Sequence, residues 1–228
     1  RAKDEEQPIG APRRSMEGAS VLVKDPYLRT VTLLGFLAFF SLTLLDVSYK
    51  TTLGQHVAPE NIARVLATVS LAGNVLSLLL QAFVARVGLR FLGTVALAGL
   101  LPFFLALTTL GWAATGAMFL LLTARVLDQG MRFSTQKTAS ELLLLPVGDT
   151  LRAKIKPILD VLLQRLAQAA ASVVALLAVE LHLKNWGILV AVSMCVWLLS
   201  ALFLRVPYKR VFAQALRGGI LRSSVVLR

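Results

Sequence analysis

The sequence RVLDQGMRFSTQKTASELLLLPVGDTLRAKIKPILDVLLQRLAQ, from Arg125 to Gln168, places charged side chains at the facing ends of two strongly apolar segments. An arginine or aspartate at the centre of a membrane helix costs about 2.5–3.5 kcal/mol on the insertion scale. If both segments span a membrane, a chain that keeps several such residues has partners or a use for them. This stretch therefore bears on both the fold and the function.

The composition is that of a membrane protein. Hydrophobic residues make up 57% of the 228 residues and charged residues only 16%, whereas a soluble domain is about half apolar and a quarter charged. The net charge of +12 would suggest nucleic-acid binding in a soluble protein, but most of the excess lies between apolar segments, where topology explains it first. The single Cys195 cannot form an intrachain disulfide, and two distant histidines do not suggest a metal site.

Six apolar segments of roughly 20 residues each match the thickness of a bilayer at about 1.5 Å rise per residue. They are expected at residues 27–54, 62–87, 91–110, 112–133, 157–179 and 186–204. We therefore predict an all-α membrane protein with a six-helix transmembrane bundle (26–205), a cytoplasmic lead-in or linker (1–25) and a basic cytoplasmic tail (206–228). Because the chain begins with Arg1 and not with Met, we also expect neighbouring segments.

Basic residues gather in alternate connections between these segments. The lead-in, the second and fourth loops and the tail are basic, and the other three connections are nearly neutral. Since cytoplasmic loops carry the excess of Lys and Arg, both termini are predicted to be cytoplasmic. The residues concerned are Arg13, Arg14, Lys24, Arg29, Arg86, Arg90, Lys137, Arg152, Lys154, Lys156, Arg205, Lys209 and Arg210.

Strongly polar residues within the membrane occur in the first, second, fourth and fifth segments, and the third and sixth have only Ser, Thr or Cys. Polar faces turn to a protein interior or to a water-filled cavity. We therefore expect helices one, two, four and five to surround a cavity, with three and six outside. Two polar helices followed by an apolar one, twice over, fit the three-plus-three repeat in each half of a major facilitator transporter, so the other half would lie outside this chain.

Charges from the fourth and fifth segments come to similar depths. Counted from the cytoplasmic side, Arg125 and Arg165 lie about 12–15 Å deep, and Asp128 and Asp160 about 7–8 Å. Arg132 shares a helix face with Arg125 and Asp128. We predict a cluster of Arg125, Asp128, Asp160 and Arg165 that binds a substrate anion or gates a pathway. The alternative is an ion-pair cluster that only fixes helices four and five.

Polar pairs on the first and second segments admit two interpretations each. Asp46 and Lys50, four residues apart near the outer mouth, form either an outer gate or an interfacial helix-end pair. Asn74 and Gln81 either line the pathway or hydrogen-bond a neighbouring helix.

The fourth connection is a cytoplasmic motif. Glu141 would pair with Lys137 on an amphipathic surface helix or latch a cytoplasmic gate. Arg152, Lys154 and Lys156 would set topology or contact anionic lipid.

Two parts of this region, RFSTQKTASELLLLP (132–146) and RAKIKPILDVLLQR (152–165), carry a resemblance. They resemble the nucleotide transporters of the ATP/ADP translocase family, found in plastids and obligate intracellular bacteria, and their major-facilitator relatives. The shared features are an Arg-x-Ser stretch, a Glu-Leu turn ending in Pro, Lys-x-Lys, Asp-Val and an Arg opening the next helix. The chain departs from the family in having Leu144 where a Tyr is usual. The resemblance is specific over residues 125–168 and architectural elsewhere.

The resemblance implies the C-terminal six-helix half of a twelve-helix carrier, with alternating access around a midplane site, ATP/ADP exchange and a bacterial inner membrane rather than a plastid envelope. The residues alone indicate only an anionic solute, for which Arg125 and Arg165 are the candidates because arginine binds phosphate or carboxylate in a bidentate way. Expected partners are membrane lipid, the missing N-terminal half and this solute.

We predict no enzyme activity, cofactor, metal or nucleic-acid binding. The sequence has no nucleophile–base constellation, Gly-rich phosphate loop or metal-ligand cluster, and its basic tail lacks interleaved aromatics. The alternative function is a membrane anchor or sensor platform that does not transport and that carries fused soluble regulatory domains.

Overall fold

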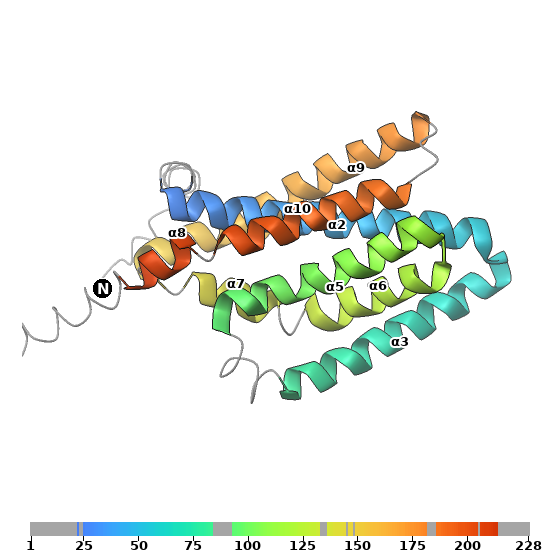
Figure 1. Ribbon diagram of the computed structural model, residues 1–228, viewed down its shortest axis with the longest axis horizontal. Helices are drawn as coiled ribbons and strands as arrows, with labels where there is room; N and C mark the ends of the chain where they lie inside the picture. The colour runs from blue at the N-terminus through green and yellow to red at the C-terminus, as the bar shows by residue number, and fades with distance from the viewer. Residues whose placement is uncertain are drawn as a thin grey trace, which may run out of the picture.

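The computed structural model describes residue 22 and residues 25–83, 93–132, 136–144, 146–147, 149–181, 186–204 and 206–213, and within these ranges it contains helices and no strand (Figure 1). The helices are α2 (Pro26–His56), α3 (Pro59–Phe83), α5 (Gly93–Thr115), α6 (Met118–Met131), α7 (Lys137–Leu143), α8 (Asp149–Pro157), the π-helix η3 (Ile158–Leu163), α9 (Gln164–Glu180) and α10 (Trp186–Phe203). The lead-in 1–21, the basic turn with Arg86 and Arg90 and the tail beyond 213 lie outside the described residues.

The long helices form a bundle in which α3 and α9 occupy opposite edges (Figure 1). α3 packs on α6, α6 on α5, α5 on α10, α10 on α2 and α2 on α9, and α2 also contacts α6. The all-helical architecture with long apolar helices is that of a multi-pass membrane protein.

The two ends of the bundle differ in what they contain. The start of α2, the short helices α7 and α8 and the end of α10 lie at one end, and the α2–α3 and α5–α6 turns lie at the other (Figure 1). At the first end the Tyr27 hydroxyl donates a hydrogen bond to the Leu143 carbonyl. At the second, a Cβ on Gly187 would lie 2.9 Å from the Ala113 Cα. The connections therefore alternate as predicted, and the orientation in a membrane stays a prediction.

Pro26 begins the first helix, as the sequence predicts. The Asp25 carboxylate caps it by accepting hydrogen bonds from the backbone N–H groups of Tyr27 (2.8 Å) and Leu28 (3.3 Å). Proline suits this first turn because its missing N–H would have no helical partner there. The helix extends to His56, two residues beyond the predicted end.

The boundary between the third and fourth helices was predicted wrongly. The third helix does not end at Gly111: it continues through Trp112, which is buried, to Thr115. The turn is made by Gly116, whose φ of 68° lies in the left-handed region, and its N–H donates to the Trp112 carbonyl (2.8 Å). A glycine inside a helix costs only about 1 kcal/mol, whereas one with positive φ commonly ends it.

The apolar helices α5 and α10 pack against other helices of the bundle. The stretches that contain α5 and α10 are more buried in the bundle than those that contain α3 and α9. Helices that are apolar on all sides suit a protein interior as well as lipid. Composition alone therefore does not decide whether protein or lipid covers α5 and α10.

Five described helical stretches are long and apolar enough to cross a membrane. They are Pro26–His56, Pro59–Ala82, Ala96–Thr115, Leu151–Glu180 and Trp186–Ala213. The predicted fourth span is represented by α6, whose 14 residues extend for only about 21 Å against a hydrocarbon core of about 30 Å. The count of six spans therefore stays a prediction.

Most of the predicted fourth loop is helical. α7 and α8 take up much of residues 137–156, and the basic run 152–156 lies within α8. α8 continues through Pro157 into η3 and α9, so that one long stretch replaces the predicted loop and fifth helix.

Candidate functional site: a charged cavity between α2, α6 and α9

A cavity of about 290 Å³ opens between three helices of the bundle. Its lining comes from α2, α6 and α9, which correspond to the predicted helices one, four and five. α3, the predicted helix two, contributes none of the described lining residues. The lining residues are Phe39, Leu42, Thr43, Asp46, Lys50, Arg125, Arg132, Gln164 and Gln168.

Asp128 is the centre of an ion-pair group formed within one turn of helix on either side. Arg125, three residues before it, donates from Nη1 to Oδ2 at 2.9 Å. Arg132, four residues after it, donates from Nε (3.0 Å) and Nη2 (2.8 Å) to Oδ1 and from Nη2 to Oδ2 (2.7 Å). The Asp128 side chain is 1% exposed. A carboxylate so deeply buried is tolerated only when it is paired and hydrogen-bonded.

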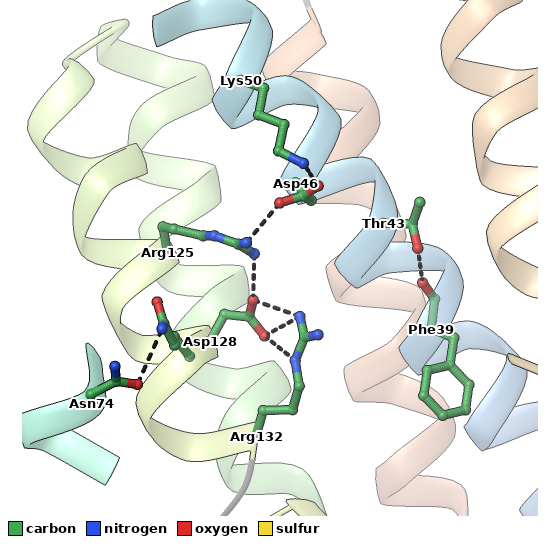
Figure 2. Close-up of polar contacts among 9 residues, drawn as sticks. Phe39, Thr43, Asp46, Lys50, Asn74, Arg125, Asp128 and Arg132 are labelled. Atoms are coloured by element: carbon green, nitrogen blue, oxygen red, sulfur yellow. Dashed lines mark hydrogen bonds and ion pairs between the residues drawn. The ribbon is translucent and has the colours of Figure 1, made fainter. Parts of the chain in front are cut away.

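The α2 residue Asp46 extends this group across the bundle. Arg125 Nη2 lies 2.7 Å from Asp46 Oδ1, and Lys50 Nζ lies 2.6 Å from Asp46 Oδ2. Figure 2 shows the resulting chain of contacts from Lys50 through Asp46 and Arg125 to Asp128 and Arg132. Three cations face two carboxylates, so the group carries one excess positive charge.

The ring of Tyr49 lies beside Arg125, and the sequence analysis missed this residue. The guanidinium carbon of Arg125 lies 5.7 Å from the centre of the Tyr49 ring, within the range of a cation–π interaction. Tyr49 is 2% exposed, so its ring is a fixed surface. The available signal was its place three residues after Asp46, on the same face of a helix.

Of the four residues predicted to cluster, the structure brings Arg125 and Asp128 together and places Asp160 and Arg165 outside the cavity lining. Both of the latter side chains are exposed, and the cavity instead receives the amides Gln164 and Gln168 from this helix. The prediction assumed a regular α-helix, but Asp160 lies in the π-helix η3. The wider π-turn alters the angular position of every later residue relative to α8.

Asp46 and Lys50 are not a separate outer-mouth pair, because Asp46 contacts Arg125. Arg125 lies seven residues into α6, about 10 Å from its start, and Asp46 lies ten residues before the end of α2, about 15 Å. The two helices therefore place these groups at similar depths.

Asn74 and Gln81 hydrogen-bond within the bundle and do not line the cavity. Asn74 Oδ1 accepts from Gln129 Nε2 at 3.3 Å, joining α3 to α6 (Figure 2), and Gln81 Nε2 donates to Ser77 Oγ at 3.3 Å. The neighbouring glycines bring these helices close: a Cβ on Gly130 would lie 2.7 Å from the Leu76 side chain. Small residues and polar side chains are common at such helix interfaces in membranes.

The cytoplasmic motif contains a second ion-pair group. Glu141 on α7 accepts hydrogen bonds from Arg152 Nη2 (2.7 Å) and Lys156 Nζ on α8, and these partners replace the predicted Lys137. The hydrogen bond from Lys156, and then that from Arg152, hold the pKa of Glu141 below its ordinary value. Lys154 lies exposed on the same helix. Arg152 and Lys156, which were predicted to set the topology or to contact anionic lipid, thus join α8 to Glu141 on α7.

In the part of the chain that the structure describes, no group of three or more His, Cys, Asp or Glu residues is arranged to hold a metal ion. No protein-family model, curated protein or solved structure matches this chain. The resemblance to nucleotide transporters therefore stays a prediction.

Proposed function

We propose that this protein is a transporter for an anionic solute, built as one half of a major-facilitator-like carrier that works by alternating access. The observation that carries the proposal is the cavity between α2, α6 and α9, where Arg125 and Arg132 are partly exposed in an ion-pair group with one excess positive charge. Charged residues within membrane segments commonly mark solute pathways.

The chemistry of the lining supports an oxyanion. Arg125 and Arg132 present guanidinium groups that are 23% and 40% exposed, and such groups bind phosphate or carboxylate in a bidentate way. Gln164 and Gln168 on α9 add neutral donors and acceptors across the cavity. A volume of about 290 Å³ is at the lower limit for ligand pockets, and suits an anionic group with its remainder held by a second bundle.

By the resemblance of residues 125–168, the solute is a nucleotide and the reaction an exchange of ATP for ADP. The cavity residues Asp46 and Arg125 lie well inside their helices, which suits this role. A carrier binds its solute near the bilayer midplane, between two bundles that rock about the binding site. The exposed α3 and α9 are the helices available to contact such a second bundle.

The first test is nucleotide exchange in proteoliposomes that hold the full-length protein. The vesicles are loaded with ATP or ADP, labelled nucleotide is added outside, and wild type is compared with Arg125→Ala and Arg165→Ala. We expect Arg125→Ala to lose exchange by at least about a hundredfold, the loss of a charged hydrogen bond worth about 3 kcal/mol. Arg165→Ala is the matched control, since this arginine lies outside the cavity, and it should keep exchange.

A folded wild type that exchanges no nucleotide would remove nucleotides from the proposal. The same vesicles are then tested with inorganic phosphate and with succinate. Absence of flux for every anion would contradict transport and favour the membrane anchor or platform.

A further inference from the structure

We infer that Asp46 is a displaceable counter-ion: its carboxylate occupies Arg125 in the empty cavity and gives way to the anionic group of the solute. This inference rests on the proposed function, because it names the residue with which the solute competes. It assigns different roles to the two carboxylates of the cluster.

The two carboxylates are held very differently. Asp128 is 1% exposed and accepts hydrogen bonds on both oxygens from Arg125 and Arg132. Asp46 is 26% exposed and lines the cavity. Its Oδ1 accepts no hydrogen bond from any residue that the structure describes, although Arg125 Nη2 is 2.7 Å away. The Arg125–Asp46 contact therefore has the distance of an ion pair without the alignment of a hydrogen bond, and it is the weaker of the two.

The second partner of Asp46 is also loosely held. Lys50 contacts Oδ2, but its side chain is 65% exposed. Ion pairs in which a partner is solvated contribute about 0–1 kcal/mol. Neither ion pair therefore holds Asp46 strongly. Its two partners, Arg125 and Lys50, are also groups that an incoming oxyanion would bind.

Arg125 keeps its position when Asp46 leaves. Its Nη1 remains bonded to the buried Asp128, and its guanidinium remains beside the fixed ring of Tyr49. The Nη2 group that faced Asp46 then becomes available without rearrangement of Arg125, and a site organised in advance binds with less entropic cost. The ligand chemistry is that of a terminal phosphate or carboxylate held by Arg125 and Lys50.

A built-in counter-ion also has a physical purpose. An arginine left unpaired within a membrane segment is costly, so an empty carrier benefits from an internal carboxylate that neutralises it. The cost of this arrangement is competition: the solute must displace Asp46 to bind.

The test is equilibrium binding of labelled ATP, and of labelled inorganic phosphate, to the purified full-length protein. We expect Asp46→Asn to lower the Kd by up to about fivefold, because a competing partner worth up to roughly 1 kcal/mol is removed. Asp46→Glu keeps the charge and should show a smaller gain in affinity than Asp46→Asn. Glu60→Gln removes the same charge from α3, outside the cavity lining, and should leave the Kd unchanged.

A double variant separates displacement from a general loss of negative charge. If the gain comes from Arg125, Asp46→Asn with Arg125→Ala should bind no more tightly than Arg125→Ala alone. A gain that survives in the double variant would overturn the inference.

The failure of the inference is distinguishable from that of the proposed function. If wild type binds either probe and Asp46→Asn binds it equally or more weakly, Asp46 is a fixed part of the site and only the inference is overturned. If Asp46→Asn binds a probe more tightly than wild type although wild type transports nothing, the inference stands without transport. If neither protein binds either probe, the inference is overturned, whereas transport is overturned only by absence of flux for every anion, succinate included.

Discussion

At the scale of single residues, Asp128 shows how a membrane protein keeps a charge that its sequence position makes expensive. The i−3 and i+4 spacing of Arg125 and Arg132 was legible in the sequence, and it correctly predicted a shared face. Spacing within α6 could not reveal the partner from another helix. The contact of Asp46 with Arg125 depends on how α2 and α6 pack.

The burial of Asp128 leads to a stability prediction. Asp128→Asn should lower the free energy of unfolding by about 3–5 kcal/mol, since it leaves Arg132 without its carboxylate partner and Arg125 with Asp46 alone. Asp46→Asn should cost about 1 kcal/mol or less, because its pairs are partly exposed. Thermal unfolding of both variants in detergent checks this, and equal losses would contradict the distinction between the two carboxylates.

At the scale of helices, five of the six predicted apolar segments are long helices, the fourth is the shorter α6, and the ends were predicted less well. Gly111 and Gly116 are both glycines in a similar setting, and only the backbone angle of Gly116 makes it the turn. A sequence does not state φ, so the choice between neighbouring glycines depends on the packing of the two helices that they join.

The contact between α3 and α6 gives a prediction for a helix interface. Gly130→Ala should destabilise the protein by about 1–3 kcal/mol, because the added Cβ would lie 2.7 Å from Leu76. Gly99→Ala is the matched control: its Cβ would have no neighbour within 4 Å, so the change should be neutral or stabilising by up to about 1 kcal/mol. Unfolding midpoints measure both, and Leu76→Ala should partly rescue Gly130→Ala.

The α7–α8 contact gives a prediction for pH. Because the folded-state pKa of Glu141 is lowered from its ordinary value of 4.5, its pairing contributes stability above about pH 4.5, and this contribution is lost as the pH falls through the lowered pKa. In Glu141→Gln this part of the acid dependence should be absent. Unfolding midpoints measured from about pH 6 to pH 3 test it, with Glu60→Gln as the control; identical acid profiles for wild type and Glu141→Gln would contradict it.

At the scale of the whole molecule, alternation of basic and neutral connections predicted the up-and-down course of the chain, which the bundle follows. The third and sixth segments were predicted to lie outside the cavity, and among the described residues neither α5 nor α10 lines it. Apolar side chains pack equally well on lipid and on protein, so the sequence contains no signal that separates the two environments for a helix without polar residues.

The orientation is testable by labelling single cysteines in a protein with Cys195→Ala. Gln55→Cys, at the exposed α2–α3 end, should react with a membrane-impermeant maleimide in intact cells. Ala153→Cys, exposed on α8, should react only after the membrane is opened. The reverse pattern would place the basic connections outside and contradict cytoplasmic termini.

The π-turn at Ile158–Leu163 has a consequence for comparing this chain with others. A π-turn accommodates about one residue more than an α-turn, so a related chain could lack one residue here and still present the same amides to the cavity. A pairing of the two sequences without a gap would then match Gln164 and Gln168 with residues on another face. The correct alignment would then have a one-residue gap inside a continuous helix, a position at which alignments usually avoid gaps.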